Sequence, residues 1–547
     1  MSDNRWGRDV ERVEIGGHPG LAYARRPRSL SELLIDARRW SDRTFLIEGA
    51  RRMTFAEHEA AVARVAQHLR EAGIAQGDRV LLLAYNRLEW LIAFWSLQCI
   101  GAVAVLGNAL WSDEEIDGAL DLADPVAMLT DRKLDSPQAA ATTVIPANSP
   151  PRTRSGAGIQ RRTRMIQLAD LQPIAEATAE IPLETATVDE DATALIMFSS
   201  GTTGAAKGVM MSHRSVIANI QNLLVLTGRM PNELPQTTPG TVSLLTVPLF
   251  HLAGIQISFS TMLSGGSLVF VAGRFDPVNV LQTIEREKVR VWGSIPTMVS
   301  RVIDEPRFAE FDTSSIRSIP MGGAAITPEL RAKVQAAFPA TKKRVGSLYG
   351  LTEAGGVLVA GSANDLAGRP GCVGRPLPVV ELRIGNPDAN GVGEILARTP
   401  TIASGYWRDD TPIADAEGWL KTGDTGRLDE EGRLFLVGRS KDIVIRGGEN
   451  IACAHVEQCL MKHPAVREVA VVPMPHADLG EEVAAVVVLK DGMQATVQQL
   501  REHAAAHLGK FQIPSRWWIR TEPLPVNALG KFVKRDLVAQ WPAKEGE

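Results

Sequence analysis

A regular alternation of helix-like and strand-like segments near the start of the chain limits the fold most strongly. Apolar residues with helical spacing at 31–40 and 55–72 alternate with apolar strand-like runs at 44–48, 78–84 and 124–131. Such alternation predicts parallel strands with helices packed across the faces of the sheet. We therefore expect an α/β fold.

The same pattern continues through the middle of the chain and then changes. Strand-like runs recur at 242–247, 267–271, 289–293 and 315–321, with helix-like segments between them. After Gly374 the sequence becomes a series of short alternating segments separated by glycine, namely VELRIG, GEILART, GWLKTGD and GRLFLVG. Alternation with glycine punctuation predicts antiparallel β-structure.

A smaller unit follows the junction GRSKD. Beyond residue 442 we expect a helix at 453–461, strands at 466–472 and 482–489, and a helix at 497–508. A final helix is expected after Pro525. This order predicts a separate α+β unit at the C-terminus.

The composition limits the kinds of molecule that the protein is expected to bind. The 547 residues exceed what one hydrophobic core normally holds, so several domain-sized units are expected. The net charge is −4, with a pI near 6.3, so no basic field is available to bind nucleic acid. The four cysteines are scattered and include no C-x-x-C pair, which argues against zinc and disulfides and favours a reducing cytoplasm. The charged N-terminal stretch MSDNRWGRDVERVE does not have the apolar segment of a secretory signal.

One uncharged segment is long enough to be compared with a membrane span. Residues 90–112 carry no charge, but Gln98, Gly101 and Asn108 interrupt the run. A helix that ends near Ile100, followed by the buried strand GAVAVLG, accounts for the segment better than a span does. We therefore expect no membrane span.

The stretch SSGTTGAAKGV, from Ser199 to Val209, carries the clearest functional signal. It follows the apolar run ALIMF and combines hydroxyl side chains, glycines and one lysine. Glycine allows backbone N–H groups to turn inward as an anion-binding nest, and the hydroxyls and Lys207 add further donors. Lys207 is followed by glycine and not by Ser or Thr, so the stretch is not a Walker phosphate loop. A flexible surface loop is the alternative, but the lysine and the preceding strand favour a phosphate site.

Two other patterns favour ordinary structural explanations. Residues 136–164 contain four prolines and an arginine cluster without interleaved aromatics, which favours a solvated loop over an anion contact. His503 and His507 lie four residues apart, but HAAAH does not contain the glutamate of a zinc protease motif. A surface histidine pair is therefore favoured over a metal site.

Five motifs occur in a fixed order along the chain: SSGTTGAAKGV, YGLTE at 349–353, KTGD at 421–424, GRSKDIVIRGGENI at 438–451 and PLPVNALGK at 523–531. With these motifs the chain resembles the acyl-adenylate-forming enzymes, which include acyl- and aryl-CoA ligases, firefly luciferase and the adenylation domains of peptide synthetases. The resemblance extends from about residue 31 to about residue 537.

The resemblance implies a fold and a domain division. The large N-terminal domain, residues 1–438, should contain α/β sheets and a small β-barrel-like subdomain, and should bind substrate and ATP. A hinge at 439–441, with Lys441 as the hinge residue, should lead to a small mobile α+β domain at 442–547.

The resemblance also implies roles for individual residues. The catalytic groups would be Lys531, Thr352, Glu353 and Arg439. Glu353 would hold Mg²⁺, for which a hard carboxylate oxygen is suited. Asp424 would accept hydrogen bonds from the ribose, Tyr349 would stack on adenine, and Lys531 would contact the reacting carboxylate and the α-phosphate.

Three larger sets follow from the same resemblance. The ATP and AMP contacts would be Ser199, Ser200, Gly201, Thr202, Thr203, Gly204, Lys207, Gly323, Ala324, Ala325, Tyr349, Gly350, Thr352, Asp424, Arg439 and Lys531. The acyl pocket would include His251, Met321, Gly323 and Gly355. Gly447, Gly448 and Glu449 would line the coenzyme A channel. For His251, a core or capping role is the equal alternative on its chemistry alone.

The implied activity is that of an AMP-forming acid–CoA ligase. ATP and Mg²⁺ would convert a hydrophobic carboxylic acid to acyl-AMP and pyrophosphate, and the thiol of coenzyme A would then displace AMP. The alternative is an enzyme specialised for one half-reaction, either adenylation for a carrier protein or thioesterification of a supplied acyl-AMP. A non-catalytic nucleotide sensor is disfavoured because the charged motif residues are all present. A homodimer is compatible with the resemblance.

Overall fold

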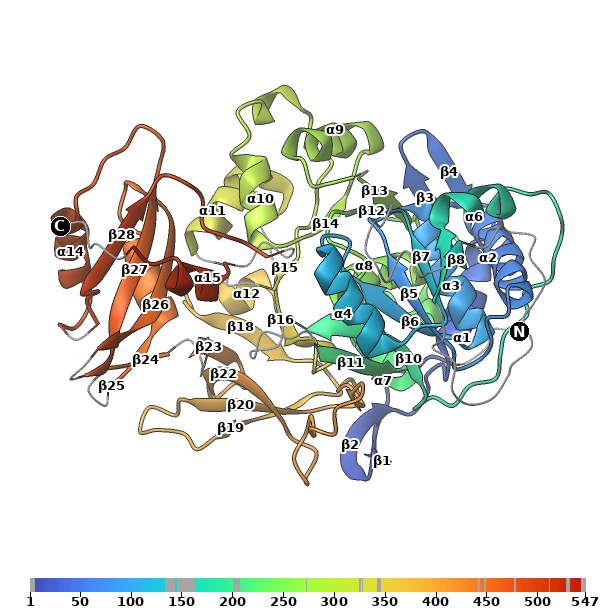
Figure 1. The fold of residues 1–547 in the computed structure, drawn as a ribbon, viewed down its shortest axis with the longest axis horizontal. Coiled ribbons are helices and arrows are strands. Elements are labelled where there is room, and N and C mark those ends of the chain that lie inside the picture. The colour runs from blue at the N-terminus through green and yellow to red at the C-terminus, as the bar shows by residue number, and fades with distance from the viewer. Residues whose placement is uncertain are drawn as a thin grey trace.

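Two sheets lie side by side in the N-terminal part of the chain, as the computed structural model shows (Figure 1). The structure describes residues 5–132, 143–144, 163–199, 207–271, 273–323, 326, 328–341, 346–439, 443–446, 449–476, 479–510, 512–527 and 532–542. The first sheet has, in spatial order, β21 (Gly405–Tyr406), β11 (Lys207–Ser212), β10 (Thr193–Ser199), β6 (Val103–Gly107), β5 (Arg79–Leu83), β7 (Ala127–Thr130), β9 (Arg164–Gln167) and β8 (Thr143–Val144). The second has β14 (Val291–Gly293), β12 (Val242–Leu245), β13 (Ser267–Phe270), β3 (Thr44–Glu48) and β4 (Arg51–Thr54).

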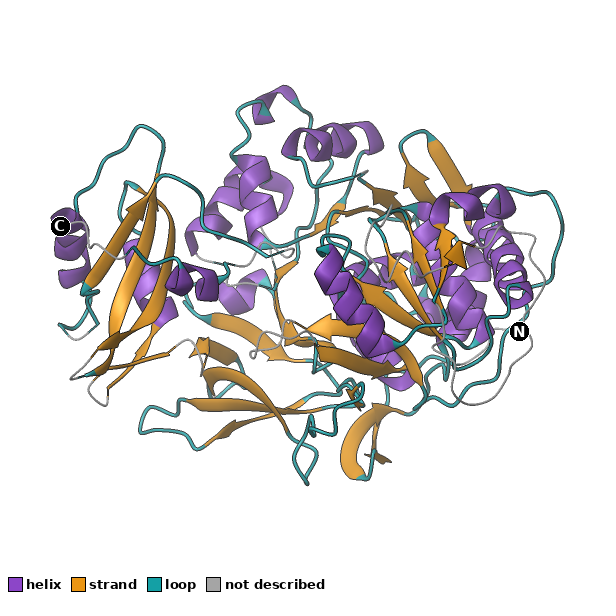
Figure 2. Cartoon of the chain, in the orientation of Figure 1, coloured by secondary structure: helices purple, strands orange, loops and turns teal. Residues whose placement is uncertain are grey.

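Most neighbours in these two sheets run parallel, as the alternating sequence predicted. The helices of this part are α1 (Leu30–Ala37), α2 (Phe55–Glu71), α3 (Leu88–Ile100), α4 (Asp113–Ala123), α6 (Leu168–Ala175), α7 (His213–Thr227), α8 (Leu252–Leu263), α9 (Pro277–Glu287), α10 (Pro296–Ile303), α11 (Pro328–Ala337) and α12 (Ala363–Leu366). Figure 2 shows these helices packed around the strands. A two-stranded hairpin, β1 (Val10–Ile15) and β2 (His18–Tyr23), precedes them.

The uncharged segment at 90–112 forms a buried helix and a buried strand. Every residue of α3 is buried, Gly101 ends the helix in a left-handed conformation, and β6 follows at the centre of the first sheet. The predicted helix and strand are therefore confirmed. Among the described residues, no helix combines the length and apolar character that a membrane crossing requires.

A third sheet contains the glycine-punctuated segments. Its order is β15 (Met321–Gly322), β16 (Ser347–Leu351), β17 (Gly356–Gly361), β18 (Cys372–Pro376), β23 (Leu434–Arg439), β22 (Leu420–Leu428), β20 (Gly393–Arg398) and β19 (Glu381–Gly385). The last four strands pair antiparallel, as the sequence predicted.

The prediction of a strand at 315–321 is largely wrong. Only Met321 and its neighbour Gly322 form a strand, and Ser318 contributes an isolated bridge to Val291. Pro320 has no N–H to donate to a ladder. Around it, the N–H groups of Arg317, Ser318 and Gly322 donate to the chain at and beside β14, and the carbonyls of Ser318 and Pro320 accept from it.

The C-terminal segment forms its own five-stranded sheet (Figure 1). Its strands are β25 (Glu449–Ala452), β24 (Ile443–Arg446), β27 (Gly480–Leu489), β26 (Val466–His476) and β28 (Arg516–Arg520), and its helices are α13 (Cys453–Leu460), α14 (Val497–Ala505) and α15 (Lys534–Ala539). Glu457 ties these elements together, because its carboxylate accepts from the Val471 N–H at 2.8 Å and pairs with Lys534 at 2.9 Å. The predicted helices and long strands occur in the predicted order, but β24, β25 and β28 are three further strands that the sequence analysis did not predict.

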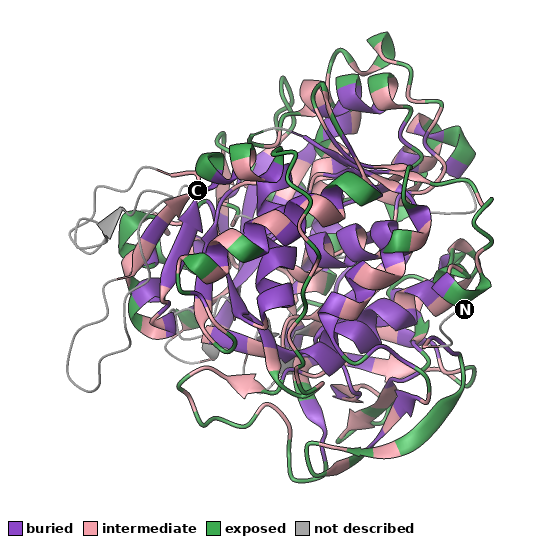
Figure 3. Cartoon of the chain, turned by 90° about the vertical axis from the view of Figure 1, so that its right-hand side faces the viewer, coloured by how far each residue is buried: buried purple, intermediate pink, exposed green. Residues whose placement is uncertain are grey.

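The position of α8 depends on the aromatic core of the N-terminal part. Phe259 packs against Trp95 and Phe94 of α3, with ring centroids 4.5 and 5.6 Å apart. Figure 3 shows that buried residues fill the strands and the inner faces of the helices. Because one face of α8 is held by this core, the face that carries Gln256 and Ser260 is turned toward a cavity.

Candidate active site

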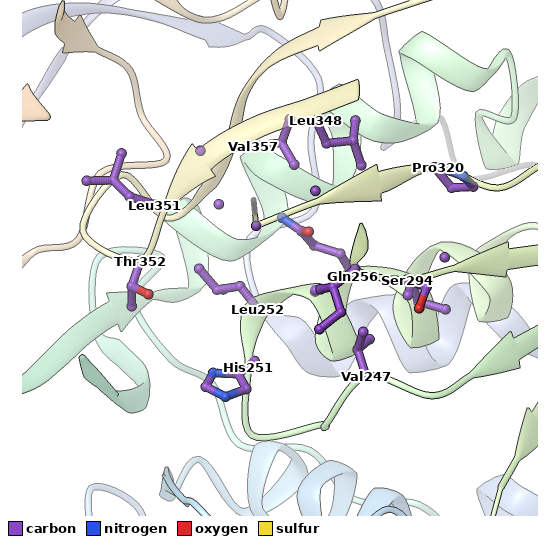
Figure 4. A pocket seen from close by; sticks show the side chains of 18 of the residues that line it. Val247, His251, Leu252, Gln256, Ser294, Pro320, Leu348, Leu351, Thr352 and Val357 are labelled. Carbon is purple, nitrogen blue, oxygen red and sulfur yellow. The ribbon is translucent and has the colours of Figure 1, made fainter. Parts of the chain in front are cut away.

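One large cavity lies where the sheets meet. It has a volume of about 2690 Å³ and is lined by residues of α7, α8, β12, β14, β16 and the C-terminal segment. Figure 4 shows Thr352 and His251 toward one side of the view, and Ser294 and Pro320 toward the other. Residues from distant parts of the chain therefore line one cavity.

Lys207 stands at the start of β11, directly after the glycine-rich loop. Ser199, the last residue of β10, is its partner across the antiparallel pair. The Lys207 ammonium lies 2.8 Å from Oδ2 of Asp409 and 4.6 Å from the centroid of the Tyr406 ring. Lys207 lines the cavity. The other predicted residues of this loop, Ser200, Gly201, Thr202, Thr203 and Gly204, lie outside the described residues.

Glu353 and Thr352 follow β16 and line the cavity. The backbone carbonyl of Glu353 accepts from the Ala403 N–H at 3.0 Å, which fixes this turn against the segment before β21. The Glu353 side chain lies close enough to the phenol of Tyr406 for its charge to affect that group. Burial, followed by the negative charges of Glu353 and Asp409, raises the pKa of Tyr406 to about 12. Tyr406 is therefore a hydrogen-bond donor at neutral pH.

Tyr349 and Asp424 come together in the interior. The Tyr349 hydroxyl donates to Oδ2 of Asp424 at 2.7 Å, and both residues are only 8% exposed. The Asp424 N–H donates to the Thr422 hydroxyl at 3.1 Å, which holds the turn at the glycine of KTGD. In the β22–β23 register, Asp424 is directly opposite Arg439. The side chain of Arg439 lies outside what the structure describes.

Small residues approach the cavity closely at two points. Gly323 and Gly350 both line it. Gly323 has a φ of +79°, where a larger residue would be strained. Ala324 and Ala325, which the sequence adds to this set, fall outside the described residues.

Two predicted pocket residues lie elsewhere. Met321 is fully buried in the hydrophobic core beside Trp292, and it is not part of the cavity wall. Gly355 has a φ of +71°, and a Cβ there would collide with the backbone carbonyl of Thr401. Its neighbour Gly356 lines the cavity instead, against Gln256. The prediction chose the wrong glycine because a register irregularity between β16 and β17 decides which of the two faces inward.

His251 is the N-cap residue of α8 and lines the cavity. Its ring lies 4.7 Å from that of Phe250, and Figure 4 shows it below Leu252 and near Thr352. His251 thus occupies the N-cap position of α8 and also lines the cavity, so the pocket role and the capping position that the sequence analysis weighed do not exclude each other.

The C-terminal segment closes one side of the same cavity. Val526, Asn527 and Phe532 line it, and Val526 and Phe532 form an antiparallel bridge. This bridge brackets the predicted Lys531, which lies outside the described residues together with Lys441, Gly447 and Gly448. For Glu449 only the backbone, in β25, is described.

Tyr406 and Asp409 were not predicted as site residues. The only sequence signal is an aromatic pair and an acidic pair after a glycine in SGYWRDD. Their partners Lys207 and Glu353 are far away in sequence. They meet because β21 pairs with β11 at the edge of the first sheet.

Comparisons with known proteins place this site in a family. A sequence profile described as "AMP-binding enzyme" matches residues 34–407, and one described as "AMP-binding enzyme C-terminal domain" matches residues 455–531. The chain is 32% identical to the putative acyl-CoA synthetase YngI of Bacillus subtilis, over 89% of this chain and 91% of that protein. It is 31% identical to 4-coumarate–CoA ligase 5 of Oryza sativa subsp. japonica, over 94% of each.

A solved structure shares the whole architecture. The o-succinylbenzoate coenzyme A synthetase MenE from Bacillus subtilis, in complex with ATP and magnesium ion, matches with a TM-score of 0.78 and 28% identity, over 93% of this chain and 99% of that one. The chain belongs to the AMP-binding enzyme family. The predicted fold class is confirmed, and so is the predicted enzyme class, an AMP-forming acid–thiol ligase.

Proposed function

We propose that this chain carries out both steps of acid–CoA ligation within the one cavity. A carboxylic acid and ATP give acyl-AMP and pyrophosphate, and the thiol of coenzyme A then attacks the acyl carbon and releases AMP. The predicted co-substrates ATP and coenzyme A and the cofactor Mg²⁺ are those expected of a relative of CoA ligases and of an enzyme solved with ATP and magnesium. The observation that carries the proposal is that residues of four of the five motifs line a single cavity.

The nucleotide would lie at the end of the cavity that is lined by Lys207, Thr352 and Gly423, and Asp424 directly follows Gly423. The Asp424 carboxylate, oriented by Tyr349 and by the turn at Thr422, suits the ribose hydroxyls because it offers two acceptor oxygens. Lys207 and the hydroxyl of Thr352 would contact phosphate oxygens. Lys207 must leave Asp409 to do so, which it can because both side chains are one-third exposed.

Glu353 fits the magnesium ion. It presents a carboxylate on the cavity wall next to the Thr352 hydroxyl, and oxygen donors of this kind are the ligands that Mg²⁺ prefers. When bound, the ion would offset negative charge on the phosphates. The phenol of Tyr406 would donate a hydrogen bond to the other carboxylate oxygen of Glu353 and hold it in place.

Lys531 would act in the first step only. Its neighbour Phe532 lines the cavity, which supports a lysine delivered to the reacting carboxylate by the C-terminal segment. A fixed cation there neutralises charge as it develops during displacement of pyrophosphate. We propose that rotation at Lys441, between domains 1–438 and 442–547, then exchanges Lys531 for Gly447, Gly448 and Glu449, next to which the thiol would enter. Cytoplasmic location and a homodimer remain parts of this proposal that rest on the family alone.

Isotope exchange between pyrophosphate and ATP tests the proposal. With a panel of carboxylic acids we expect exchange without coenzyme A, and thioester formation when coenzyme A is added. Exchange with no thioester would contradict the two-step proposal and favour adenylation for a carrier protein. Thioester formation from supplied acyl-AMP, without exchange for any acid, would favour the thioesterifying alternative.

A further inference from the structure

Residues along the whole length of α8 line the cavity, and this part of the cavity is here called the tunnel. His251, Gln256, Ser260 and Ser264 recur with helical spacing on the face of α8 that lines it. A helix of 12 residues is about 18 Å long. β12 runs beside it, from Thr241 at the far end to Val247 near His251. An acid held at Thr352 could therefore extend its tail about this distance.

The far end of the tunnel is basic. Arg229, Arg290 and Arg317 line it from three separate segments, and the Arg317 N–H donates to the Arg290 carbonyl at 2.8 Å. The acidic side chains among the described lining residues are Glu115, Glu353, Glu394 and Asp415, and none of these belongs to the segments that form the far end. The charged side chains described at the far end are therefore all basic.

Two polar atoms in this part of the wall are buried without a partner. Within the described part of the chain, Nη1 of Arg229 and Oγ of Ser260 make no hydrogen bond. Burial lowers the pKa of Arg229, and the charge of Arg290 lowers it further. A half-buried guanidinium next to a like charge is stabilised when a ligand supplies an anion.

We propose that the far end of this tunnel binds a second acidic group of the substrate, so that the acid activated is a long dicarboxylic acid. One carboxylate reacts at Thr352, and the other is held by Arg229 with Arg290, while Ser260 donates to a polar atom of the tail. This inference rests on the proposed function and names its substrate class. An apolar tail end would leave the half-buried Arg229 charge without this anion.

Paired substrates test the inference without any mutation. For acids of equal chain length that end in a carboxylate or in a methyl group, the ratio of kcat/KM in pyrophosphate exchange should favour the carboxylate about 10-fold or more. A lengthening series should show the preference only once the chain reaches the far end. Preference for the methyl-ended acids at every length would overturn the inference and leave the ligase function intact. Failure of both series would count against the inference and against the function.

Substitution of the arginines tests whether they cause the preference for acids that end in a carboxylate. Arg229→Gln and Arg290→Gln should each reduce the preference about 10-fold, with methyl-ended acids and the KM for coenzyme A unchanged. Arg286→Gln is the matched control, because Arg286 is exposed, pairs with Glu287 and does not line the cavity. Arg290 is itself exposed, so its variant should fold even where Arg229→Gln does not. An unchanged preference in folded Arg290→Gln and Arg229→Gln would refute the assignment, and a raised KM for coenzyme A would assign the arginines to that substrate.

A second, independent observation concerns the C-terminal unit. α13 packs against α14, and the ligand atoms of Cys459, His503 and His507 all lie within 4.8 Å of one another. Each histidine has one ring nitrogen next to a backbone carbonyl: Nε2 of His503 is 3.0 Å from the Cys459 oxygen, and Nδ1 of His507 is 2.9 Å from the His503 oxygen. If these nitrogens donate, the other nitrogen of each ring is free to coordinate, which is the usual arrangement of metal-bound histidines.

The geometry points to a zinc-type site at Cys459, His503 and His507, with a solvent-filled fourth position. Binding would release the thiol proton to solvent, since the thiolate is the ligand. The sequence favoured a surface histidine pair because Cys459 lies 44 residues away and its approach to His503 is not visible in HAAAH.

Cobalt is the probe for this site. Co²⁺ added to the full chain should give a thiolate-to-metal charge-transfer band, and Zn²⁺ should abolish it and raise the melting temperature. Cys459→Ser should lose the band, whereas Cys372→Ser, at another buried free thiol, should keep it. No band in the wild type, or an equal band in Cys459→Ser, would refute the site.

Discussion

At the nucleotide end of the cavity, polar side chains are hydrogen-bonded to one another. At the acyl end, two polar side chains each bury an atom that has no such partner within the described residues. Asp424 accepts from Tyr349, and Asp409 accepts from Lys207. At the far end of α8, Arg229 and Ser260 each bury a polar atom that has no partner within the described residues. The difference separates two tasks. Under the proposed function, one end would hold the nucleotide with preformed geometry, and the other would select an acid whose own polar group completes the site.

The largest effect is expected at the nucleotide end. Lys531→Ala should lower the rate of acyl-AMP formation by about 10²–10³-fold or more, because a cation positioned for the transition state is lost. Thioester formation from supplied acyl-AMP should remain near the wild-type rate. Pyrophosphate exchange and single-turnover thioesterification measure the two steps. Equal loss of both steps would remove the distinction between them and contradict the assigned role.

Asp424→Ala should raise the KM for ATP by about 10- to 100-fold. The change removes the ribose acceptor and also leaves the buried Tyr349 hydroxyl without its partner, at a cost of about 1–3 kcal/mol. Tyr349→Phe keeps the carboxylate and should have a smaller effect. Initial rates at varied ATP, with the acid saturating, distinguish the two. If both variants leave the KM unchanged, the preformed pair does not bind the nucleotide.

Asp409→Ala should lower the KM for ATP by up to about 5-fold, because the change removes an exposed ion pair that competes for Lys207. Lys207 holds the pKa of Asp409 well below its usual range, so the pair persists from neutral pH to mildly acidic pH. The contribution of the pair to stability is present above the ordinary aspartate pKa and is lost only as the pH falls through the lowered value. The difference in KM should therefore be the same at about pH 8 and about pH 5. Asp410→Ala, at the exposed neighbour, is the control and should behave as wild type.

The smallest effect should separate stability from binding at the acyl end. Ser260→Ala removes a buried hydroxyl that has no partner within the described chain, so the melting temperature should stay the same or rise slightly. The KM for the preferred acid should rise a few-fold. Ser264→Ala removes a hydroxyl that donates to the Ser260 carbonyl at 2.7 Å, and should lower stability by about 1 kcal/mol. Equal losses of stability in both variants would show that Ser260 has a structural partner after all.

The nucleotide end could be predicted from sequence because its chemistry is written in short, contiguous motifs. Lys207, Thr352 and Glu353 lie next to their own glycines and strands, and these local patterns define which residues line the cavity. The acyl end has no such motif. Arg229, Ser260 and Arg290 belong to three elements, and only the packing of α7, α8 and β14 brings them to one wall. Met321 and Gly355 were misplaced for the same reason, since burial and register decide which side of a strand or turn faces a cavity.

The sequence by itself determined the α/β order, the antiparallel segments after Gly374, the separate C-terminal unit and the adenylate-forming family, because periodicity and ordered motifs are local properties of the chain. Tertiary structure alone decided the bond between Tyr349 and Asp424, the pairing of Lys207 with Asp409 and the basic far end of the tunnel. These contacts join residues far apart in the chain, and their geometry depends on how the sheets pack.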